Sequence, residues 1–278
     1  MTVTQPDGTT ASMRDLRDKT VLIAGGTKGI GLATGLRFGR AGAACVLTYH
    51  WGSADETTVR AAFERAGAVD PILINADMSR QEDTEDLMRQ LREQCEVVDT
   101  FVSNVAVAPR VGRLEDINSR DFHRTFDYSV IPVIEYLQAI RRTFGRPPKY
   151  MIALSSTGID HFTPNYAMVA ASKAALEALC RYVSYDLRDE DFRFNVVRTL
   201  GVITDSFRDM FGAEFEEAVR RHIPEEWLVQ ASEVADVILA LCSGYFDALK
   251  GQAITVDKGA LFADTVMRLY EEQSDLGL

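Results

Sequence analysis

A short apolar run at Thr20–Ala24 leads directly into a glycine-rich turn, and a helical pattern follows from Gly31 to Gly39. Because its residues are apolar almost without interruption, the run is typical of a strand that is covered on both faces. Other apolar runs of strand length alternate with helical patterns over most of the chain. This alternation predicts an α/β fold, in which about seven parallel strands form one doubly wound sheet with helices on both faces.

The boundaries of the elements follow from the same pattern. Strands are predicted over residues 20–24, 44–49, 71–75, 98–103, 150–155, 193–197 and 252–256. Helices are predicted over residues 31–39, 57–65, 81–94, 120–142 and 167–187. The segment 204–230 interrupts the alternation, and we expect it to be an inserted helical flap. We expect one domain over residues 19–259, a flexible N-terminal tail over 1–18 and a C-terminal extension over 260–278.

Composition and charge exclude several classes of protein. The net charge is −11, so a nucleic acid partner is not expected, because phosphate binding needs a basic surface. The longest apolar runs have the length of strands, and neither a membrane span nor a secretion signal is expected. The four cysteines lie far apart without the spacing of metal ligands, which predicts no metal site and reduced thiols in a cytoplasmic protein.

The turn after the first strand reads Gly25-Gly26-Thr27-Lys28-Gly29-Ile30-Gly31. Gly25 permits the tight turn, Gly29 a close approach of the backbone, and Gly31 the packing of helix on strand. The helix N-terminus then presents N–H groups to a pyrophosphate. Such a turn can be purely structural, but on the first strand–helix unit it indicates a dinucleotide site of the Rossmann type. We assign cofactor contacts to Gly25, Thr27, Lys28, Gly29, Ile30 and Gly31.

The second strand indicates which dinucleotide is bound. NAD sites usually carry an acidic residue at the end of this strand, but the sequence here reads Thr48-Tyr49-His50-Trp51-Gly52-Ser53. Lys28 is positioned to pair with a 2′-phosphate instead, although it can equally be a solvated loop charge. We therefore predict NADP(H) rather than NAD(H). Asp77 either accepts from the adenine amino group or is a surface turn residue. The predicted cofactor contacts also include Tyr49, Met78, Asn104 and Thr204.

A tyrosine and a lysine, Tyr166 and Lys173, stand at the start of a strongly helical stretch, and Val169 occupies the position four residues before the lysine. The separation of tyrosine and lysine is about two helical turns, so both side chains are expected on one face of the helix. A core aromatic residue and a surface lysine would give the same pattern, but Ser155-Ser156 ends the preceding strand beside them. We predict Tyr166, Lys173 and Ser156 as catalytic residues.

From Thr20 to Gly259 the chain resembles the short-chain dehydrogenase/reductase family. The resemblance implies an oxidoreductase that uses a nicotinamide cofactor. It also implies a homotetramer or homodimer built on the helices at 120–142 and 167–187. The matching features are Gly25/Gly29/Gly31, Ser103-Asn104, Ser155-Ser156, the Tyr166–Lys173 pair and Val256-Asp257-Lys258-Gly259.

Within that family the chain looks more similar to the enoyl-thioester reductases, which act on acyl carrier protein or coenzyme A thioesters. Three stretches carry this similarity: Ser103–Pro109, Asp127–Ser129 and Pro164–Lys173. Carbonyl-reducing members usually have asparagine at the position of Asp127 and tyrosine at that of Val169. Both positions thus differ from the carbonyl reductases, in the direction of the enoyl-thioester reductases.

The resemblance implies that NADPH supplies hydride to the activated C=C of an α,β-unsaturated thioester or conjugated carbonyl compound, in fatty-acid-like or specialised biosynthesis. Tyr166 would donate to the enolate oxygen, which is remote from the carbon that receives hydride. Lys173 would hold the ribose hydroxyls and Ser156 would orient the oxygen. The alternatives are a carbonyl reductase of the same fold and a catalytically silent NADP-binding protein.

Several other positions have two interpretations. Asp127 is either catalytic or a holder of backbone groups. Thr199-Leu200 stands where the family usually has Pro-Gly or Gly-Gly. Lys258 stands where it usually has glycine. The flap's apolar residues form either a lid or a small core: Phe207, Met210, Phe211, Phe215 and Trp227. Its basic residues either meet the phosphates of a carrier or form a solvated face: Arg208, Arg220, Arg221 and His222. Residues after the domain form an extra contact or a pocket wall: Phe262, Met267, Leu269 and Tyr270.

Overall fold

The computed structural model describes residues 3–4, 10–11, 15–50, 54–107, 109, 111, 113–223 and 225–262. Within these residues, seven parallel strands form one sheet in the order β5-β4-β3-β6-β7-β8-β9, which confirms the predicted architecture. An antiparallel pair, β1 (Val3–Thr4) and β2 (Thr10–Ala11), lies outside this sheet. The strands of the sheet are β3 (Thr20–Ala24), β4 (Ala44–Tyr49), β5 (Ile72–Asn75), β6 (Thr100–Ser103), β7 (Tyr150–Ser156), β8 (Arg193–Thr199) and β9 (Ala253–Val256).

The strand order reverses between β3 and β6. The chain runs outward from β3 through β4 to β5, and then returns to place β6 on the opposite side of β3. In open parallel sheets, ligands bind outside the carboxyl ends of the strands at the point where the order reverses. The loops after β3 and β6 therefore mark the expected position of the site.

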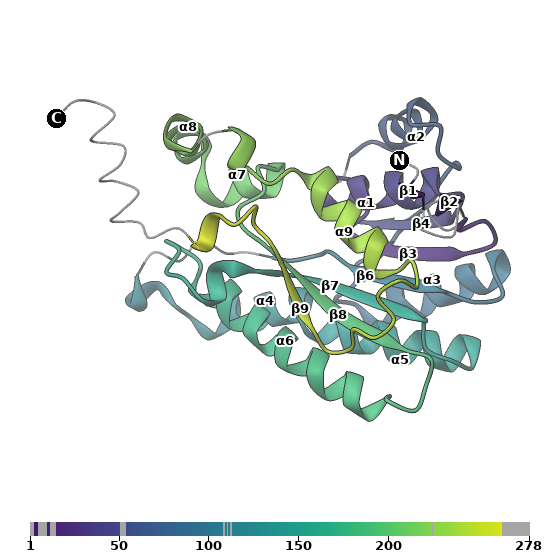
Figure 1. The fold of residues 1–278 in the computed structure, drawn as a ribbon. Helices are drawn as coiled ribbons and strands as arrows, with labels where there is room; N and C mark the ends of the chain where they lie inside the picture. Colours follow the sequence, from purple (N-terminus) through teal and green to yellow (C-terminus); the bar gives the residue numbers. More distant parts are fainter. Residues whose placement is uncertain are drawn as a thin grey trace.

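Helices cover both faces of the sheet (Figure 1). One face packs against α1 (Gly29–Arg40), α2 (Glu56–Arg65) and α9 (Ala231–Leu241). The opposite face packs against α3 (Gln81–Gln94), α4 (Ser119–Ser129), α5 (Ile131–Phe144) and α6 (Ala167–Asp186). The predicted flap contains α7 (Asp205–Phe211) and α8 (Ala213–His222). Short 3₁₀ turns are η1 (Leu114–Asp116), η2 (Thr157–Ile159), η3 (Glu225–Trp227) and η4 (Ala260–Phe262).

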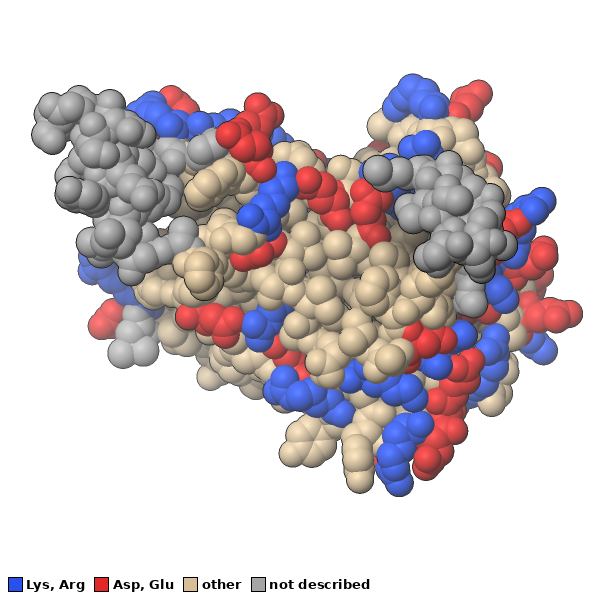
Figure 2. All heavy atoms as spheres, in the orientation of Figure 1, with Lys and Arg blue, Asp and Glu red and all other residues tan. Residues whose placement is uncertain are grey.

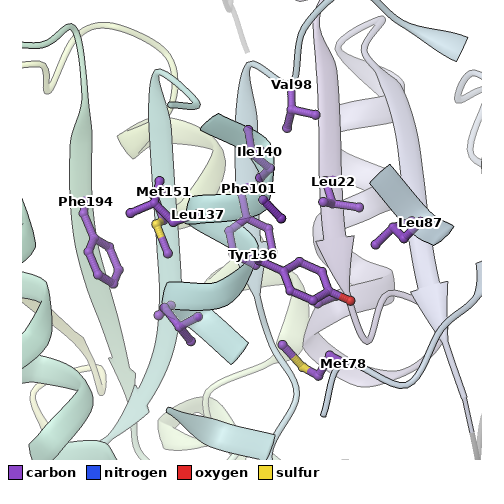
Figure 3. Packing of buried hydrophobic residues seen from close by; sticks show 14 of the residues in the cluster. Leu22, Met78, Leu87, Val98, Phe101, Tyr136, Leu137, Ile140, Met151 and Phe194 are labelled. Carbon is purple, nitrogen blue, oxygen red and sulfur yellow. The ribbon is translucent and has the colours of Figure 1, made fainter. Parts of the chain in front are cut away.

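Apolar side chains from the central strands fill the space between the sheet and the helices. On the side of α5, the rings of Phe101 and Tyr136 stack with their centroids 5.3 Å apart, and both residues are fully buried. Figure 3 shows Leu22, Phe101 and Met151, from three neighbouring strands, beside Tyr136 and residues of α5. Burial of each large apolar side chain contributes about 1.5–3 kcal/mol, so this packing fixes the strands that carry the site.

The predicted single helix over 120–142 is wrong, because the segment forms two helices, α4 and α5, that meet at Val130. Pro132 lies in the first turn of α5. A proline lacks an N–H donor and disfavours helical backbone in the residue before it, so a helix can begin there but does not run through. Gly145 ends α5 with φ +76°.

The helix α9 is absent from the sequence-based prediction. It packs along α1, and the residues of its apolar stripe, Val234 and Ile238 among them, are buried. Gln230 and Glu233 form a capping box at its start, which is a recognisable signal for a helix N-terminus.

Other predictions concern the ends of the chain. The expected tail over 1–18 and extension over 260–278 lie mostly outside the described residues, as do Met267, Leu269 and Tyr270. Phe262 is 97% exposed. No helix among the described residues has both the length and the apolarity needed to cross a membrane.

Candidate active site

Two glycines shape the turn from β3 to α1. Gly25 has φ +72°, and a Cβ on Gly31 would lie only 2.1 Å from the Gly25 carbonyl oxygen. Asn104, just after β6, donates from Nδ2 to the same oxygen at 2.9 Å. Asn104 therefore holds the backbone of the turn, while Thr27 is buried and Ile30 packs against the core. The first N–H groups of an α-helix have no partner within the helix, so a turn of this shape fits a pyrophosphate.

The flap begins against this turn. A Cβ on Gly29 would lie 3.2 Å from Cγ2 of Thr204, which is the N-terminal cap of α7. Nζ of Lys28 lies 3.9 Å from Oδ2 of Asp205. The structure thus brings together the predicted contacts Lys28, Gly29 and Thr204, but it also gives Lys28 an acidic neighbour on the flap that the sequence analysis did not foresee.

Asp77, after β5, is buried rather than a surface turn residue. Its Oδ1 accepts from the N–H of Ser79 at 3.0 Å and from the Ser79 hydroxyl at 2.8 Å. Its Oδ2 accepts from the Tyr128 hydroxyl at 3.0 Å. Burial alone would raise the pKa of Asp77, but these hydrogen bonds lower it below its usual value. The carboxylate is therefore charged and fixed in position, and the neighbouring Met78 is buried.

The end of β4 has an acidic neighbour, Glu56, that was not predicted. The Tyr49 hydroxyl is hydrogen-bonded to the carboxylate of Glu56 at the start of α2, and this bond raises the pKa of Tyr49. Nδ1 of His50 lies 3.0 Å from Oδ1 of Asn75. Glu56 thus brings to this edge a carboxylate that the sequence analysis did not consider. The next residues, Trp51–Ser53, lie outside the described part of the chain.

Ser156 and Tyr166 lie together at the end of β7. The Ser156 hydroxyl accepts from the N–H of Gly158 at 3.1 Å. A Cβ on Gly158 would lie 2.7 Å from Cε1 of Tyr166, so the tyrosine ring rests on this turn. Burial raises the pKa of Tyr166, and a side-chain hydrogen bond with Ser156 acts in the opposite sense. The net rise keeps the phenol protonated at neutral pH, which is the form that donates a proton.

Lys173 lies on α6, where Val169 is buried. Nζ of Lys173 donates to the Leu154 carbonyl oxygen on β7 at 2.8 Å. Burial lowers the pKa of Lys173 to about 8. Tyr166 is the N-terminal cap residue of α6 rather than a residue within it. The expectation that both side chains project from one helical face is therefore refined, because the tyrosine precedes the first helical residue.

The flap's aromatic residues pack on one another and on Tyr166. The ring centroids of Phe207 and Phe215 each lie 4.9 Å from that of Phe211. The Phe211 ring in turn stacks on Tyr166 at 6.5 Å with an interplanar angle of 18°. The aromatic residues therefore form a small core that also borders the site. Trp227 is 40% exposed, and the Met210 side chain lies outside the description.

The flap's arginines pair with acids of the same segment, which agrees with the solvated-face interpretation. Nε of Arg208 and Nε of Arg220 lie 2.6 Å and 3.0 Å from carboxylate oxygens of Glu216. Arg221 lies 2.9 Å from Glu217. The His222 side chain lies outside the described part.

The structure shows the surroundings of two positions at which the chain departs from the family pattern. A Cβ on Gly201, after Thr199-Leu200, would lie 2.8 Å from the ring of Phe207, so this bend makes room for the flap. Lys258 has φ +55°, and its Nζ donates to the Leu228 carbonyl oxygen at 3.1 Å. Its ammonium also lies 3.0 Å from Glu233, so Lys258 joins the end of the flap to the start of α9.

Asp127 is exposed on α4, whereas Ser129 on the same helix is buried. The sequence analysis also missed an ion network of Asp160, Glu177 and Arg198 beside the site. A signal was present, because Glu177 follows Lys173 by one helical turn on a helix with many apolar residues.

Comparisons with known proteins agree with this geometry. A sequence profile described as Enoyl-(Acyl carrier protein) reductase matches residues 24–260. The enoyl-[acyl-carrier-protein] reductase [NADH] FabI of Aquifex aeolicus (strain VF5) is 27% identical over 250 residues, which cover 88% of this chain and 92% of that protein. The 1-cyclohexenylcarbonyl-CoA reductase of Streptomyces collinus is 27% identical over 246 residues, 87% of each chain.

A solved structure extends the likeness to three dimensions. The crystal structure of a short-chain dehydrogenase from Burkholderia cenocepacia J2315 in complex with NADP matches with a TM-score of 0.77 at 25% identity, covering 89% of this chain and 99% of that one. Since the profile spans most of the sequence and the fold is shared along nearly the whole length of a solved relative, this protein is an oxidoreductase of the short-chain dehydrogenase/reductase family, within the group described as enoyl-(acyl carrier protein) reductases.

Proposed function

We propose that this protein is an NADPH-dependent reductase of activated C=C bonds, with an α,β-unsaturated thioester or a related conjugated carbonyl compound as substrate. One observation carries the proposal. The hydroxyl-bearing aromatic residue at the start of α6 is Tyr166, seven residues before Lys173, whereas Val169, four residues before the lysine, is apolar and 2% exposed. Relative to residue 169, Tyr166 stands nearly one helical turn further from the lysine.

That displacement suits the chemistry of conjugate reduction. Hydride arrives at the β-carbon, and negative charge develops on the carbonyl oxygen at the far end of the conjugated system. A donor aimed at that oxygen stabilises the developing enolate. Tyr166 is protonated and stacked on Phe211, so its ring is held, and in this proposal its hydroxyl donates to the substrate oxygen.

The cofactor, when bound, supplies the hydride. The turn at Gly25–Gly31 would hold its pyrophosphate, Asp77 its adenine, and Lys173 the ribose hydroxyls. The Burkholderia structure contains NADP, which supports NADP(H), whereas the Aquifex relative is named for NADH. Lys28 favours a 2′-phosphate, and Glu56 is the carboxylate that would favour a free 2′-hydroxyl.

The substrate's carrier is proposed from chemistry and from relatives. The aromatic cluster of Phe207, Phe211 and Phe215 gives the flap an apolar side for an acyl group or ring. The Streptomyces relative is named for a coenzyme A ester and the Aquifex relative for an acyl carrier protein. Both carriers present a thioester, so a coenzyme A thioester is a suitable first substrate.

The deciding experiment is a matched pair of substrates. Crotonyl-CoA and acetoacetyl-CoA have the same carbon skeleton and carrier, and differ in whether a C=C or a ketone is reduced. We expect NADPH consumption with the first and much less with the second. Tyr166→Phe removes only the hydroxyl, and we expect it to lower kcat by about 10²-fold or more, as loss of a positioned donor does. Full activity of Tyr166→Phe would refute the assigned role of the tyrosine.

A second candidate is ketone reduction by the same site. The observation in its favour is that the Ser156 hydroxyl and the Tyr166 ring both lie against Gly158, since two neighbouring hydroxyls can both donate to one carbonyl oxygen. Exclusive reduction of acetoacetyl-CoA in the paired assay would establish this alternative.

We also propose that the protein is a homo-oligomer, as its family resemblance implies. Tyr182 and Tyr185 on α6 are 78% and 71% exposed. Figure 2 shows a broad area without charged side chains on the face that carries α9 and β9. Exposed aromatic side chains and uncharged areas of this kind favour association with another copy of the chain.

A further inference from the structure

A buried carboxylate lies one helical turn beyond Lys173 on α6. Glu177 is 4% exposed. Its Oε1 accepts from the Ser155 hydroxyl at 2.8 Å and from Nε of Arg198 at 2.6 Å. Its Oε2 accepts from Nη2 of Arg198. The hydrogen bonds that Arg198 donates to Glu177 also hold the pKa of Arg198 above its usual value.

The guanidinium of Arg198 has a second acidic partner. Its Nη1 lies 2.6 Å from Oδ2 of Asp160, whose side chain is 50% exposed. Asp160 directly follows the turn η2, which starts after Ser156. Arg198 is also the register partner of Ser155 between β7 and β8. The network therefore ties the end of β7 to β8 and to α6.

Side chains of α6 form hydrogen bonds with two successive residues at the end of β7. Lys173 binds the carbonyl oxygen of Leu154, and Glu177 binds the hydroxyl of Ser155. Because Lys173 and Glu177 are one helical turn apart, they lie on the same face of α6. The distance between strand end and helix is thus fixed by two polar contacts.

The loop that these contacts fix, residues 156–160, lies against the ring of Tyr166. Gly158 lies between Ser156 and Asp160, and its Cα supports the ring of Tyr166, as the 2.7 Å distance to a built Cβ shows. A displacement of Asp160 therefore displaces the surface on which Tyr166 rests, and with it the Ser156 hydroxyl.

We propose that Asp160, Glu177 and Arg198 are positioning residues, which hold the loop 156–160 so that the Tyr166 hydroxyl meets the acceptor oxygen. A buried ion pair is a weak source of stability, because desolvation of the charges offsets much of their attraction. A role in fixing geometry explains this network better, since the planar guanidinium of Arg198 binds two carboxylates at fixed angles. The proposal rests on the reductase part of the proposed function and holds for either a C=C or a C=O acceptor.

Asp160→Asn is the first test, because Asp160 lies at the exposed end of the network and Glu177 keeps its partner. We expect kcat to fall about tenfold, since a small misplacement of a donor slows the reaction strongly. KM for NADPH and Tm stay unchanged, because the cofactor turn and the core are not touched. The solvent deuterium isotope effect on kcat rises, because proton donation becomes slower. Glu177→Gln shows the same changes more strongly.

A matched ion pair elsewhere provides the control. Nε of Arg37 lies 2.6 Å from Oδ1 of Asp236, with side-chain exposures of 30% and 57%, close to the 20% and 50% of the pair between Arg198 and Asp160. Asp236→Asn therefore removes an equivalent pair between α1 and α9, and we expect kcat and the isotope effect to remain those of the wild type.

A second measurement does not depend on turnover. Amide hydrogen exchange over residues 154–166 is expected to speed up in Asp160→Asn and Glu177→Gln, and not in Asp236→Asn. If the wild type reduces none of the acceptors tested, the proposed function fails, and the exchange data alone decide the role of the network. Unchanged exchange in this loop in both variants, or wild-type kcat in Asp160→Asn with an active acceptor, would overturn the proposal.

Discussion

Single residues around Lys173 show which parts of the site follow from spacing in the sequence. Tyr166, Lys173 and Ser156 were predicted from their positions along the chain, and the structure brings Ser156 to Tyr166 and Lys173 to the neighbouring Leu154. Glu177 was not predicted, because an acid on a helix is usually a solvated residue, and its partner Arg198 comes from a different strand. Pairings of this kind depend on the register of β7 and β8, which no local pattern encodes.

The burial of Lys173 leads to a prediction on stability. Its pKa is lowered to about 8 in the folded protein, whereas an unfolded lysine titrates near 10.4. Between these values the unfolded chain binds more protons, so the free energy of unfolding gains from Lys173 as pH rises, and below about 8 the cost of the buried charge is fully present. Lys173→Met removes that cost, and it also removes the lysine that we propose as catalytic.

We therefore expect Lys173→Met to lose turnover, and to be more stable relative to the wild type at neutral pH than at about pH 10. Urea unfolding at both pH values measures the difference. Lys250→Met is the control, since the Lys250 ammonium also donates to a backbone oxygen, that of Arg188 at 3.2 Å, but is only partly buried. A Lys173→Met difference that does not change with pH would contradict burial as the cause.

At the scale of elements, periodicity predicted most of the structure and failed where tertiary packing decides. The strands and the helices α1, α2, α3 and α6 lie within a few residues of their predicted positions. The break between α4 and α5 was overlooked because the apolar spacing continues through Val130, although Pro132 marks it. The helix α9 is buried against α1, and its capping box was the one local signal of its start.

The junction of β3 and α1 carries a prediction for cofactor binding. In Gly31→Ala the new Cβ would lie 2.1 Å from the Gly25 carbonyl oxygen, a backbone atom that cannot move without opening the turn. We expect loss of NADPH binding, measured by calorimetry, with the sheet intact by circular dichroism.

Gly39→Ala is the matched change on the same helix. There the Cβ would meet side-chain atoms of Ala68 and Phe63 at 3.0 Å and 3.1 Å, so a small shift relieves the contact. Binding is expected to persist. Wild-type affinity in Gly31→Ala would show that the turn does not hold the dinucleotide.

The whole molecule is acidic, with a net charge of −11, yet it exposes aromatic residues on α6. Sequence alone indicated a doubly wound sheet and an oligomer on family grounds, but it did not show which side chains of α6 face outward. That distinction depends on the packing of the opposite side of α6 against β7 and β8.

We expect the protein to elute as a dimer or tetramer in size-exclusion chromatography with light scattering. The double variant Tyr182→Glu/Tyr185→Glu places charges on the exposed face of α6 and is expected to give a smaller species. Val69→Glu, at a residue that is 45% exposed between α2 and β5, is the control and should not change the mass. A monomeric wild type would contradict the proposed assembly.

The contact of the flap with the glycine turn has a kinetic consequence. Thr204 lies against Gly29 and Asp205 lies near Lys28, so the segment that borders the proposed acceptor site contacts the segment that we assign to the dinucleotide. If the acceptor substrate bound first, the nucleotide would then have to enter beneath the flap. If the proposed sites are correct, we expect compulsory-order addition in product-inhibition kinetics, with the nucleotide entering first and the oxidised nucleotide leaving last.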